Sequence, residues 1–214
     1  MSKIATAVLT VCLSLFLAGC PVRPRPLSQP ETIVAEGAYV HEKSGMTFPL
    51  SVGDYRRTEI IRYDEQNLDV SAGYDLYDGR RKVAATVYVY PAPSPLSIGA
   101  LMNTVVSGRA ILTKKEFEAR TREILHAHPG GKLMEDTEMS IPIGGVTRVG
   151  RIATFEYEQN FAGQYQMVRS HLCMFDFVGG KWTLKYRITY PKNLETTSEI
   201  DALLQGVPWN VPQG

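Results

Sequence analysis

The stretch LDVSAGYDLYDGRRKVAATVYVY, residues 68–90, holds two β-like segments on either side of a turn. The first segment places an apolar side chain at every second position, namely Leu68, Val70, Ala72, Tyr74 and Leu76. Asp78 and Gly79 follow, and residues 83–90 are rich in β-branched and aromatic side chains. Alternation with a period of two predicts strands with one buried face, and the Asp-Gly pair predicts a hairpin turn between them.

Similar strand patterns lie on both sides of this hairpin. One further strand is expected at residues 58–63, which makes the first half a meander of about three strands. Downstream, turn residues rich in glycine separate four more expected strands, at 132–141, 146–158, 164–178 and 181–190. Consecutive hairpins of this kind predict an antiparallel sheet.

Between the two groups of strands, the apolar spacing changes from two residues to three and four. A first helix is expected from Ser97 to Gly108. A second is expected from Thr113, which can form a capping box with Glu116. A short final helix is expected after Thr196, which can form a capping box with Glu199.

The predicted order is therefore three strands, two helices, four strands and one helix. This order predicts an α+β fold in which an antiparallel sheet of about seven strands packs with two to three helices. It resembles the Mog1/PsbP-like fold, an antiparallel sheet flanked by helices. The known members of that family are mostly binding or assembly factors, so the resemblance implies a binding role.

The N-terminus begins with one basic residue, Lys3, followed by an uncharged run from Ile4 to Ala18. The run is shorter than the roughly 20 residues that a membrane-spanning helix needs, and a proline-rich segment follows it. This is the pattern of a secretory signal peptide, here residues 1–19.

LAGC at residues 17–20 resembles the lipobox of bacterial lipoproteins, with Leu17 three positions before Cys20 and small residues between them. In that family the cysteine thiol receives a diacylglycerol, the chain is cut just before it, and the new amine is usually acylated. The resemblance implies a lipid anchor on Cys20 and a membrane as a partner. An ordinary signal peptide with a chance cysteine is the alternative. Pro21 stands where the inner-membrane retention signal usually places Asp, which favours the outer membrane.

Residues 20–43 are predicted to be a tether that carries the lipidated cysteine. The segment lacks apolar periodicity and contains several prolines, at positions 21, 24, 26 and 30. A single globular domain is expected to follow, from residue 44 to residue 214.

The net charge of the mature chain argues against one class of function. Loss of residues 1–19 would remove Lys3 and no acidic residue, so 23 basic side chains become 22, equal to the 22 acidic ones. A neutral domain lacks the basic surface that nucleic acid binding needs.

The cysteines indicate that the mature domain has no intrachain disulfide. Because Cys12 would leave with the signal peptide and Cys20 would carry lipid, Cys173 has no disulfide partner. Its apolar surroundings predict a buried core residue.

Signatures of common catalytic sites, such as GxSxG, HExxH, CxxC and GxxxxGK, do not occur in the sequence. Glu156 and Glu158 share one strand face and could in principle form an acid–base pair, but solvated carboxylates are the favoured interpretation. His126 and His128 stand two apart on a helix and point about 200° away from each other, so they cannot bind one metal ion. The sequence therefore predicts no catalytic residue, metal ligand or cofactor site.

Tyr88 and Tyr90 share one strand face, and Lys185 and Arg187 share another. These four residues form the candidate binding surface, a groove for a peptide, a glycan or an anionic lipid head group. The alternative is that the tyrosines are core and rim residues while the basic side chains face solvent.

Two hypotheses for the function follow. The first is a non-catalytic envelope lipoprotein whose domain, facing the periplasm, binds another envelope protein or a wall or membrane component such as a glycan. The second is a small envelope hydrolase or ligand-processing enzyme with a non-standard site of scattered Tyr, Arg and Glu residues. The tether, the neutral charge and the missing catalytic signatures favour the first.

Overall fold

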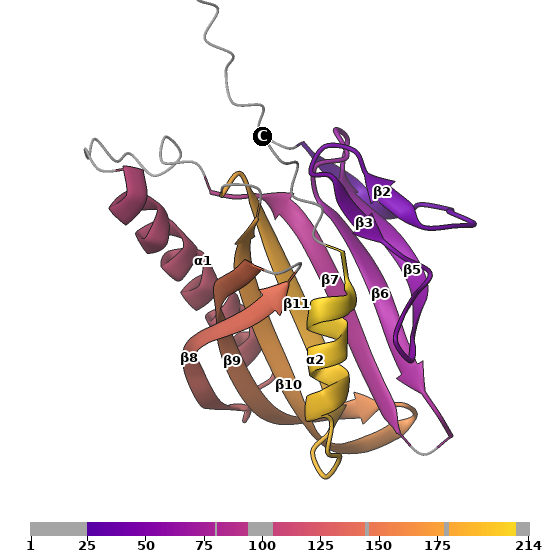
Figure 1. Cartoon of the computed structure of the whole chain (residues 1–214). Helices are drawn as coiled ribbons and strands as arrows, with labels where there is room; N and C mark the ends of the chain where they lie inside the picture. Colours follow the sequence, from indigo (N-terminus) through magenta and orange to yellow (C-terminus); the bar gives the residue numbers. More distant parts are fainter. Residues whose placement is uncertain (1–24, 80, 94–104, 144–145, 178–179, 209–214) are drawn as a thin grey trace, which may run out of the picture.

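The computed structural model describes residues 25–79, 81–93, 105–143, 146–177 and 180–208, over which the chain forms eleven strands and two helices (Figure 1). The first seven strands are β1 (Pro26–Thr32), β2 (Tyr39–His41), β3 (Met46–Phe48), β4 (Ser51–Val52), β5 (Tyr55–Asp64), β6 (Val70–Tyr77) and β7 (Lys82–Pro91). Helix α1 (Val105–Ala127) precedes β8 (Lys132–Ile143), β9 (Val146–Phe161), β10 (Gln164–Phe177), β11 (Trp182–Pro191) and helix α2 (Thr197–Gly206). Cys20 and the predicted signal peptide lie outside the described residues.

Nine strands form one antiparallel sheet, in the order β1-β5-β6-β7-β11-β10-β9-β8 with β4 paired to β5; β2 and β3 form a separate hairpin. The seven strands predicted from alternation all occur, but the sheet is larger than predicted because short strands in residues 26–52 add to it. Two helices against a sheet of this size make the fold mostly antiparallel β, so the α+β description holds only loosely.

The sheet consists of two consecutive halves that join through one pair of strands. Strand β7, which ends the first half, pairs along its length with β11, the last strand of the chain. In this register Tyr88 lies opposite Lys185, and Thr86 lies opposite Arg187. Residues almost a hundred positions apart in the sequence thus become cross-strand neighbours at the centre of the sheet.

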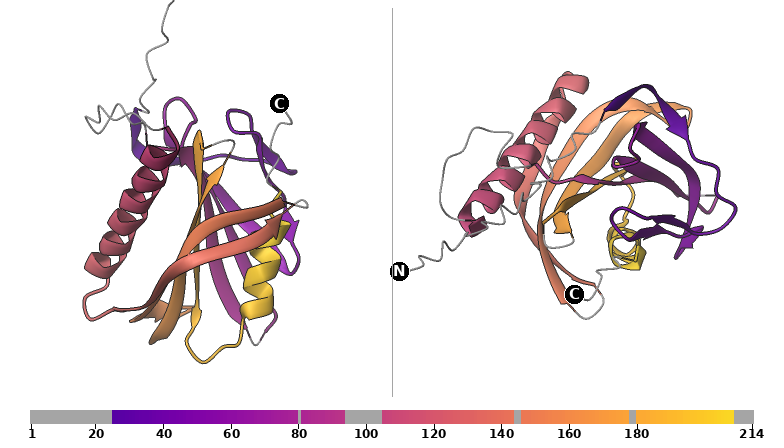
Figure 2. Two further views of the ribbon diagram at one scale, coloured as in Figure 1. Left: turned by 60° about the vertical axis from the view of Figure 1, so that its left-hand side comes forward. Right: turned by 90° about the horizontal axis from the view of Figure 1, so that it is seen from above.

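The two helices cover opposite faces of the sheet, which curves around α2 and leaves α1 outside the curve (Figure 2). On the α1 face, Phe117 is fully buried against a cluster from β9 and β10, which comprises Ala153, Phe155, Tyr157, Phe161, Val168, Leu172 and Met174. On the α2 face, Ile200, Leu203 and Leu204 join the larger core. Alternating residues of β9 and β10 serve the two faces, as the period of two requires.

The N-terminal segment differs from the tether predicted for residues 20–43. Its described part contains β1, which pairs with β5 at the edge of the sheet, and β2, which pairs with β3. His41, at the end of β2, is fully buried and meets the edge of Trp182, with ring centroids 5.4 Å apart. Its ring nitrogens lie 2.7 Å from Ser44 Oγ and 2.8 Å from the Asn67 carbonyl oxygen. Residues 25–43 therefore belong to the folded domain.

Helix α1 also differs from its prediction. It runs without a break from Val105 to Ala127, so Gly108 does not end a helix and Thr113 does not begin one. The proposed capping box is wrong, because Thr113 lies inside the helix and Glu116 pairs instead with Arg120 at 2.7 Å. Most of the first predicted helix, residues 97–104, lies outside the described residues.

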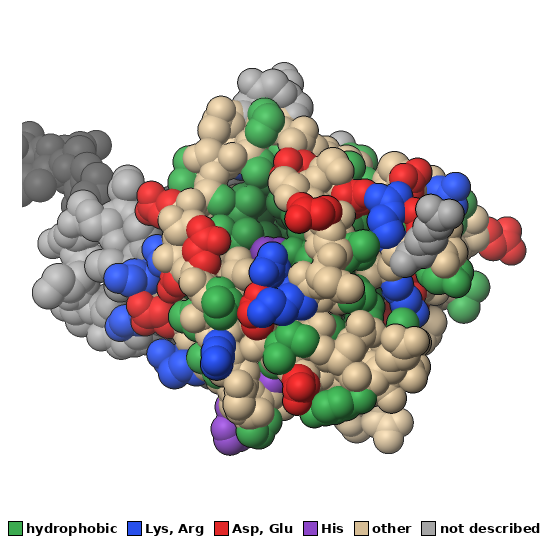
Figure 3. All heavy atoms as spheres, turned by 90° about the horizontal axis from the view of Figure 1, so that it is seen from below, with side chains coloured by type: hydrophobic (Ala, Val, Ile, Leu, Met, Phe, Trp, Pro, Cys, Tyr) green, Lys and Arg blue, Asp and Glu red, His purple; other side chains and the backbone are tan. Residues whose placement is uncertain are grey.

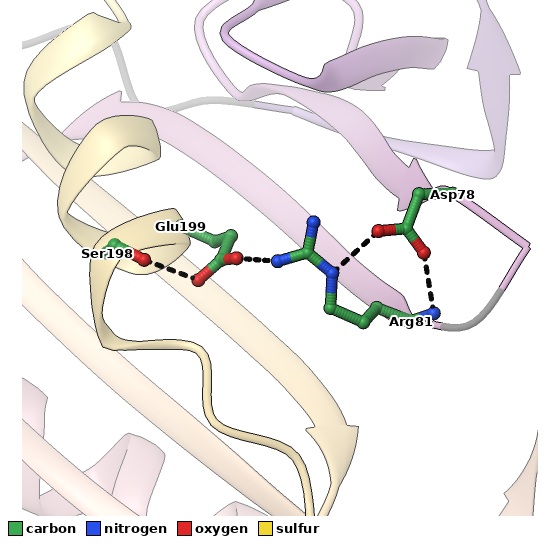
Figure 4. A network of polar contacts seen from close by, with 4 residues as sticks. All are labelled: Asp78, Arg81, Ser198 and Glu199. Carbon is green, nitrogen blue, oxygen red and sulfur yellow. Dashed lines mark hydrogen bonds and ion pairs between the residues drawn. The ribbon is translucent and has the colours of Figure 1, made fainter.

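Helix α2 begins after Thr196 as predicted, but the Thr196 side chain forms no capping hydrogen bond with the described residues. Glu199, its expected partner in the capping box, instead binds Arg81 across the molecule (Figure 4). Arg81 Nε also donates to Asp78 at 2.6 Å, and Ser198 Oγ donates to Glu199 at 2.8 Å. This network fastens α2 to the β6–β7 turn.

Candidate functional site

Two hollows lie on opposite faces of the sheet, and each is lined by ionisable side chains. The first, which we call the α2-side cavity, has a volume of about 420 Å³ and lies between α2 and strands β8 to β11. Its lining comprises Met134, Glu135, Met139, Ile152, Thr154, Glu156, Arg169, His171, Tyr190, Thr197, Ile200, Asp201 and Leu204.

Glu156, on β9, is the most buried carboxylate of this cavity, at 8% exposure. Lys192 Nζ lies 2.7 Å from one of its oxygens, and Arg169 Nη2 lies 2.7 Å from the other. Hydrogen bonds from Lys192 and then Arg169 lower the pKa of Glu156, so it stays ionised. Glu158 is exposed on the same strand. The two glutamates therefore do not form an acid–base pair, in agreement with the interpretation favoured from the sequence.

His171, on β10, is held between two hydroxyl groups. Its Nδ1 lies 3.0 Å from Thr154 Oγ1, and its Nε2 lies 2.7 Å from the Tyr190 hydroxyl. Burial lowers the pKa of His171 to about 4, and Arg169 and Arg187 add to the shift. The ring is therefore neutral near pH 7, with both nitrogens engaged.

Part of the cavity wall is apolar, although the exposed carboxylates of Glu135 and Asp201 also line the cavity. Met139 and Ile152 from the sheet and Ile200 and Leu204 from α2 supply this apolar part. Figure 3, seen from below, shows a hollow with hydrophobic side chains inside it and a group of basic and acidic side chains beside it. The cavity thus presents an apolar surface next to a charged one.

The second hollow, which we call the tyrosine pocket, lies on the α1 face and has a volume of about 210 Å³. It is lined by Tyr63, Asp69, Tyr88, Tyr90, Arg120 and Lys185. The pocket lies over the seam between the two halves of the sheet, where Tyr88 and Lys185 are cross-strand partners. Helix α1 contributes Arg120, which also binds Glu116 at 2.7 Å.

Lys185 stands over the tyrosine rings. Its ammonium nitrogen is 3.8 Å from the centroid of Tyr88 and 5.6 Å from that of Tyr90. Cation–π contacts of this kind favour the charged form, but burial acts in the opposite sense. Burial and then Arg120 lower the pKa of Lys185 to about 8.

Three of the four residues of the predicted binding surface therefore meet in one pocket. Arg187 does not line it, because it lies two positions beyond Lys185 on β11, away from Tyr90. Its guanidinium instead reaches toward β9 and β10, where Nη2 donates to Ser170 at 3.1 Å and to Tyr157 at 3.3 Å. Arg187 supports the packing of the α1 face instead of facing a ligand.

The other sequence candidates have structural explanations. Cys173 is completely buried, and burial raises the pKa of its thiol to about 12, which confirms it as a core residue. His128 stacks on Tyr157, with ring centroids 3.7 Å apart. Among the residues that the structure describes, no group of three or more His, Cys, Asp or Glu side chains could hold a metal ion.

Sequence reasoning missed the α2-side cavity. Thr154, Glu156, Arg169 and His171 stand at alternate positions on neighbouring strands, so they share one face of the hairpin. The alternation of residues in these two strands already puts the four polar side chains on a face that also supplies core residues. Polar residues on such a face are the signal that could have indicated a site. Helix α2, which closes the cavity, and Tyr190, which contacts His171, are brought to these residues only by the fold.

None of the helices in the described ranges is long and apolar enough to span a bilayer. No protein-family model matches the sequence, and no curated protein is significantly similar to it.

Proposed function

We propose that this protein is a lipid-anchored envelope protein whose folded domain binds an amphiphilic ligand in the α2-side cavity without converting it. The anchor would be the lipid on Cys20, and the domain would face the periplasm, with the outer membrane favoured over the inner. The signal peptide pattern and the LAGC motif at residues 17–20 support this location.

One observation carries the binding part of the proposal. The α2-side cavity combines about 420 Å³ of space with an apolar wall and a charged group at one side. Ligand sites are typically hollows of about 300–1,000 Å³ with apolar walls and a few placed polar groups. A molecule with an apolar chain and a polar head would match both surfaces.

The state of the ionisable groups supports binding over turnover. Glu156 is neutralised by two cations, so it is a poor proton donor or acceptor near pH 7. His171 is engaged by hydroxyls at both nitrogens, and its pKa of about 4 makes it a weak base. Such groups orient a ligand more readily than they transfer protons to it.

Filling the cavity tests the proposal. Thr197, an exposed residue at the start of α2, lines the cavity, so Thr197→Trp is expected to place an indole there at little cost to folding. The domain of residues 25–214 would be titrated calorimetrically with sodium octanoate and with neutral 1-octanoylglycerol. We expect at least one to bind the wild type and Thr197→Trp to weaken that binding about tenfold or more, which corresponds to about 1.4 kcal/mol.

Gln205→Trp is the matched control, because Gln205 is an exposed residue of the same helix and does not line the cavity. It is expected to leave the affinity unchanged. Binding that both variants weaken equally, or that neither weakens, would place the amphiphile elsewhere on the protein and contradict the proposal.

A further inference from the structure

The tyrosine pocket contains two opposite charges that do not neutralise each other directly. Lys185 and Asp69 both line it, and they attract each other electrostatically. Within the described ranges, however, no ion pair or side-chain hydrogen bond engages the Lys185 ammonium or the Asp69 carboxylate. The Asp69 backbone is held, since its N–H donates to Asp64 and its carbonyl accepts from Tyr63 N at 2.9 Å.

Both groups are partly removed from water. Lys185 is placed under α1 against two tyrosine rings, and Asp69 lies just before β6, beside the same rings. Ions in such surroundings lose hydration and are stabilised by a partner of opposite charge. The pocket therefore offers a place for a positive group near Asp69 and a place for a negative group near Lys185.

This pattern discriminates among ligand classes. A simple anion would satisfy Lys185 but would face the carboxylate of Asp69. A neutral sugar would bring no opposite charge to either ion. A molecule that carries both charges compensates both residues at once, and the cavity volume of about 210 Å³ admits a small one.

We infer that the tyrosine pocket binds a small zwitterion of the amino-acid type, with its ammonium group against Asp69 and its carboxylate against Lys185. Arg120 stands at the rim and adds positive charge on the carboxylate side, although Glu116 and Glu123 already bind it. The rings of Tyr63, Tyr88 and Tyr90 form apolar walls for the rest of the ligand.

The tyrosines are well placed for this role. Tyr63 and Tyr88 stack with centroids 6.3 Å apart, and the Tyr63 hydroxyl lies 3.0 Å from Ser71 Oγ. The Tyr90 hydroxyl lies 3.5 Å from Glu116. Because these contacts hold the rings, the pocket would need little rearrangement on binding, which lowers the entropic cost.

The inference predicts a pH profile. Burial raises the pKa of Asp69 to about 6 and lowers that of Lys185 to about 8. Below about pH 6 Asp69 gains a proton and no longer attracts the ammonium; above about pH 8 Lys185 loses its proton and no longer attracts the carboxylate. Affinity should therefore be highest between these values. The other titratable or charged groups near them are Tyr63 and Asp64 on β5, Tyr88 and Tyr90 on β7, Arg187 on β11, and Glu116 and Arg120 on α1; the like charge of Asp64 also raises the pKa of Asp69.

The experiment is a calorimetric titration of the full-length protein in mild detergent with glycine, L-alanine and L-phenylalanine. N-acetyl-L-alanine, which lacks the ammonium, and L-alaninamide, which lacks the carboxylate, are the matched ligands. We expect at least one free amino acid to bind. If L-alanine binds, both blocked derivatives should bind about tenfold more weakly or worse, since each leaves one protein charge without its partner. If only glycine or phenylalanine binds, its own acetyl and amide derivatives replace those of alanine.

Substitutions of Lys185 and Asp69 test which of the two residues binds each end of the ligand. Lys185→Met and Asp69→Asn should each weaken binding of the amino acid about tenfold or more. Lys181→Met and Asp75→Asn, which lie outside the pocket, should not weaken it.

Thr197→Trp should also leave amino acid binding unchanged, because it alters the opposite face of the sheet. The inference is thus independent of the amphiphile proposal. If a pocket variant fails to fold, the wild-type pH profile and the blocked ligands still decide the question.

Three results would overturn the inference. The first is the absence of amino acid binding by the wild type up to about 10 mM, about ten times the millimolar dissociation constant at the weak end of the usual affinity scale. The second is equal binding of the free and blocked ligands. The third is an affinity that does not change between pH 5 and pH 9.

Discussion

Cys20→Ala is expected to move the protein from the membrane fraction to the soluble fraction, or to leave it unprocessed with its signal peptide attached. The two or three acyl chains proposed for this cysteine would anchor the protein stably, because each buried methylene contributes about 0.8 kcal/mol. Without the thiol, no diacylglycerol can be added. Fractionation of cells and mass measurement of the mature chain check the result.

Cys12→Ala is the matched control, since Cys12 lies within the apolar run that would be removed with the signal peptide. It should be processed and retained as the wild type is. Normal cleavage and full membrane retention of Cys20→Ala would show that the chain is held by something other than a lipid at this position.

Gly150→Ala is expected to destabilise the domain strongly. A methyl group at Gly150 would lie 2.4 Å from the Phe175 ring and 2.5 Å from the Met174 carbonyl oxygen, so strands β9 and β10 would have to separate locally. Overpacking of a core costs about 1–3 kcal/mol and occasionally more. For a domain of this size, each kcal/mol lowers the melting temperature by about 2–4 °C.

Gly37→Ala provides the comparison, because, apart from Gly37 and its two chain neighbours, no described residue has a heavy atom within 4 Å of the position that the methyl group would take. Thermal unfolding followed by circular dichroism should give a melting temperature close to that of the wild type for Gly37→Ala and a clearly lower one for Gly150→Ala. Equal melting temperatures would mean that β9 and β10 do not approach each other as closely as described.

Strands with one buried face were the easiest elements to predict. In β7 and β11, every second residue is apolar and joins the core on the α2 face, so the pattern in the chain repeats the pattern in space. Each strand is a local feature with its own turn signals. The order in which the two halves meet, through β7 and β11, has no local signal and could not be predicted.

The elements that were missed have weak local patterns. Strand β1, PLSQPET, is polar and contains two prolines, and it forms because the edge of β5 offers backbone hydrogen-bonding partners. In α1, a glycine in the helix costs about 1 kcal/mol, which cooperative extension and the packing of Phe117 against β9 and β10 can offset. Local preferences at Gly108 and Thr113 were therefore overridden.

The candidate sites also combine local features, which the sequence shows, with contacts that only the fold creates. Tyr88, Tyr90 and Lys185 were recognised as unusual residues on strand faces, but their meeting in one pocket depends on the β7–β11 register. Arg187 was grouped with Lys185 by spacing, and its length carries it to Ser170 and Tyr157 instead. His171 has no partner close to it in the sequence, because Thr154 and Tyr190, which contact its ring, come from two other strands.

The central claim, that the domain is a receptor for an amphiphile in the α2-side cavity, is tested most directly by methyl nuclear magnetic resonance during an octanoate titration. The account predicts saturable shifts of the methyl signals of Ile152, Ile200 and Leu204, which line the cavity. The signals of Val34 and Val40, which are exposed elsewhere, should not move. Shifts spread over the exposed valines, or an unchanged spectrum in the cavity at saturating octanoate, would contradict it.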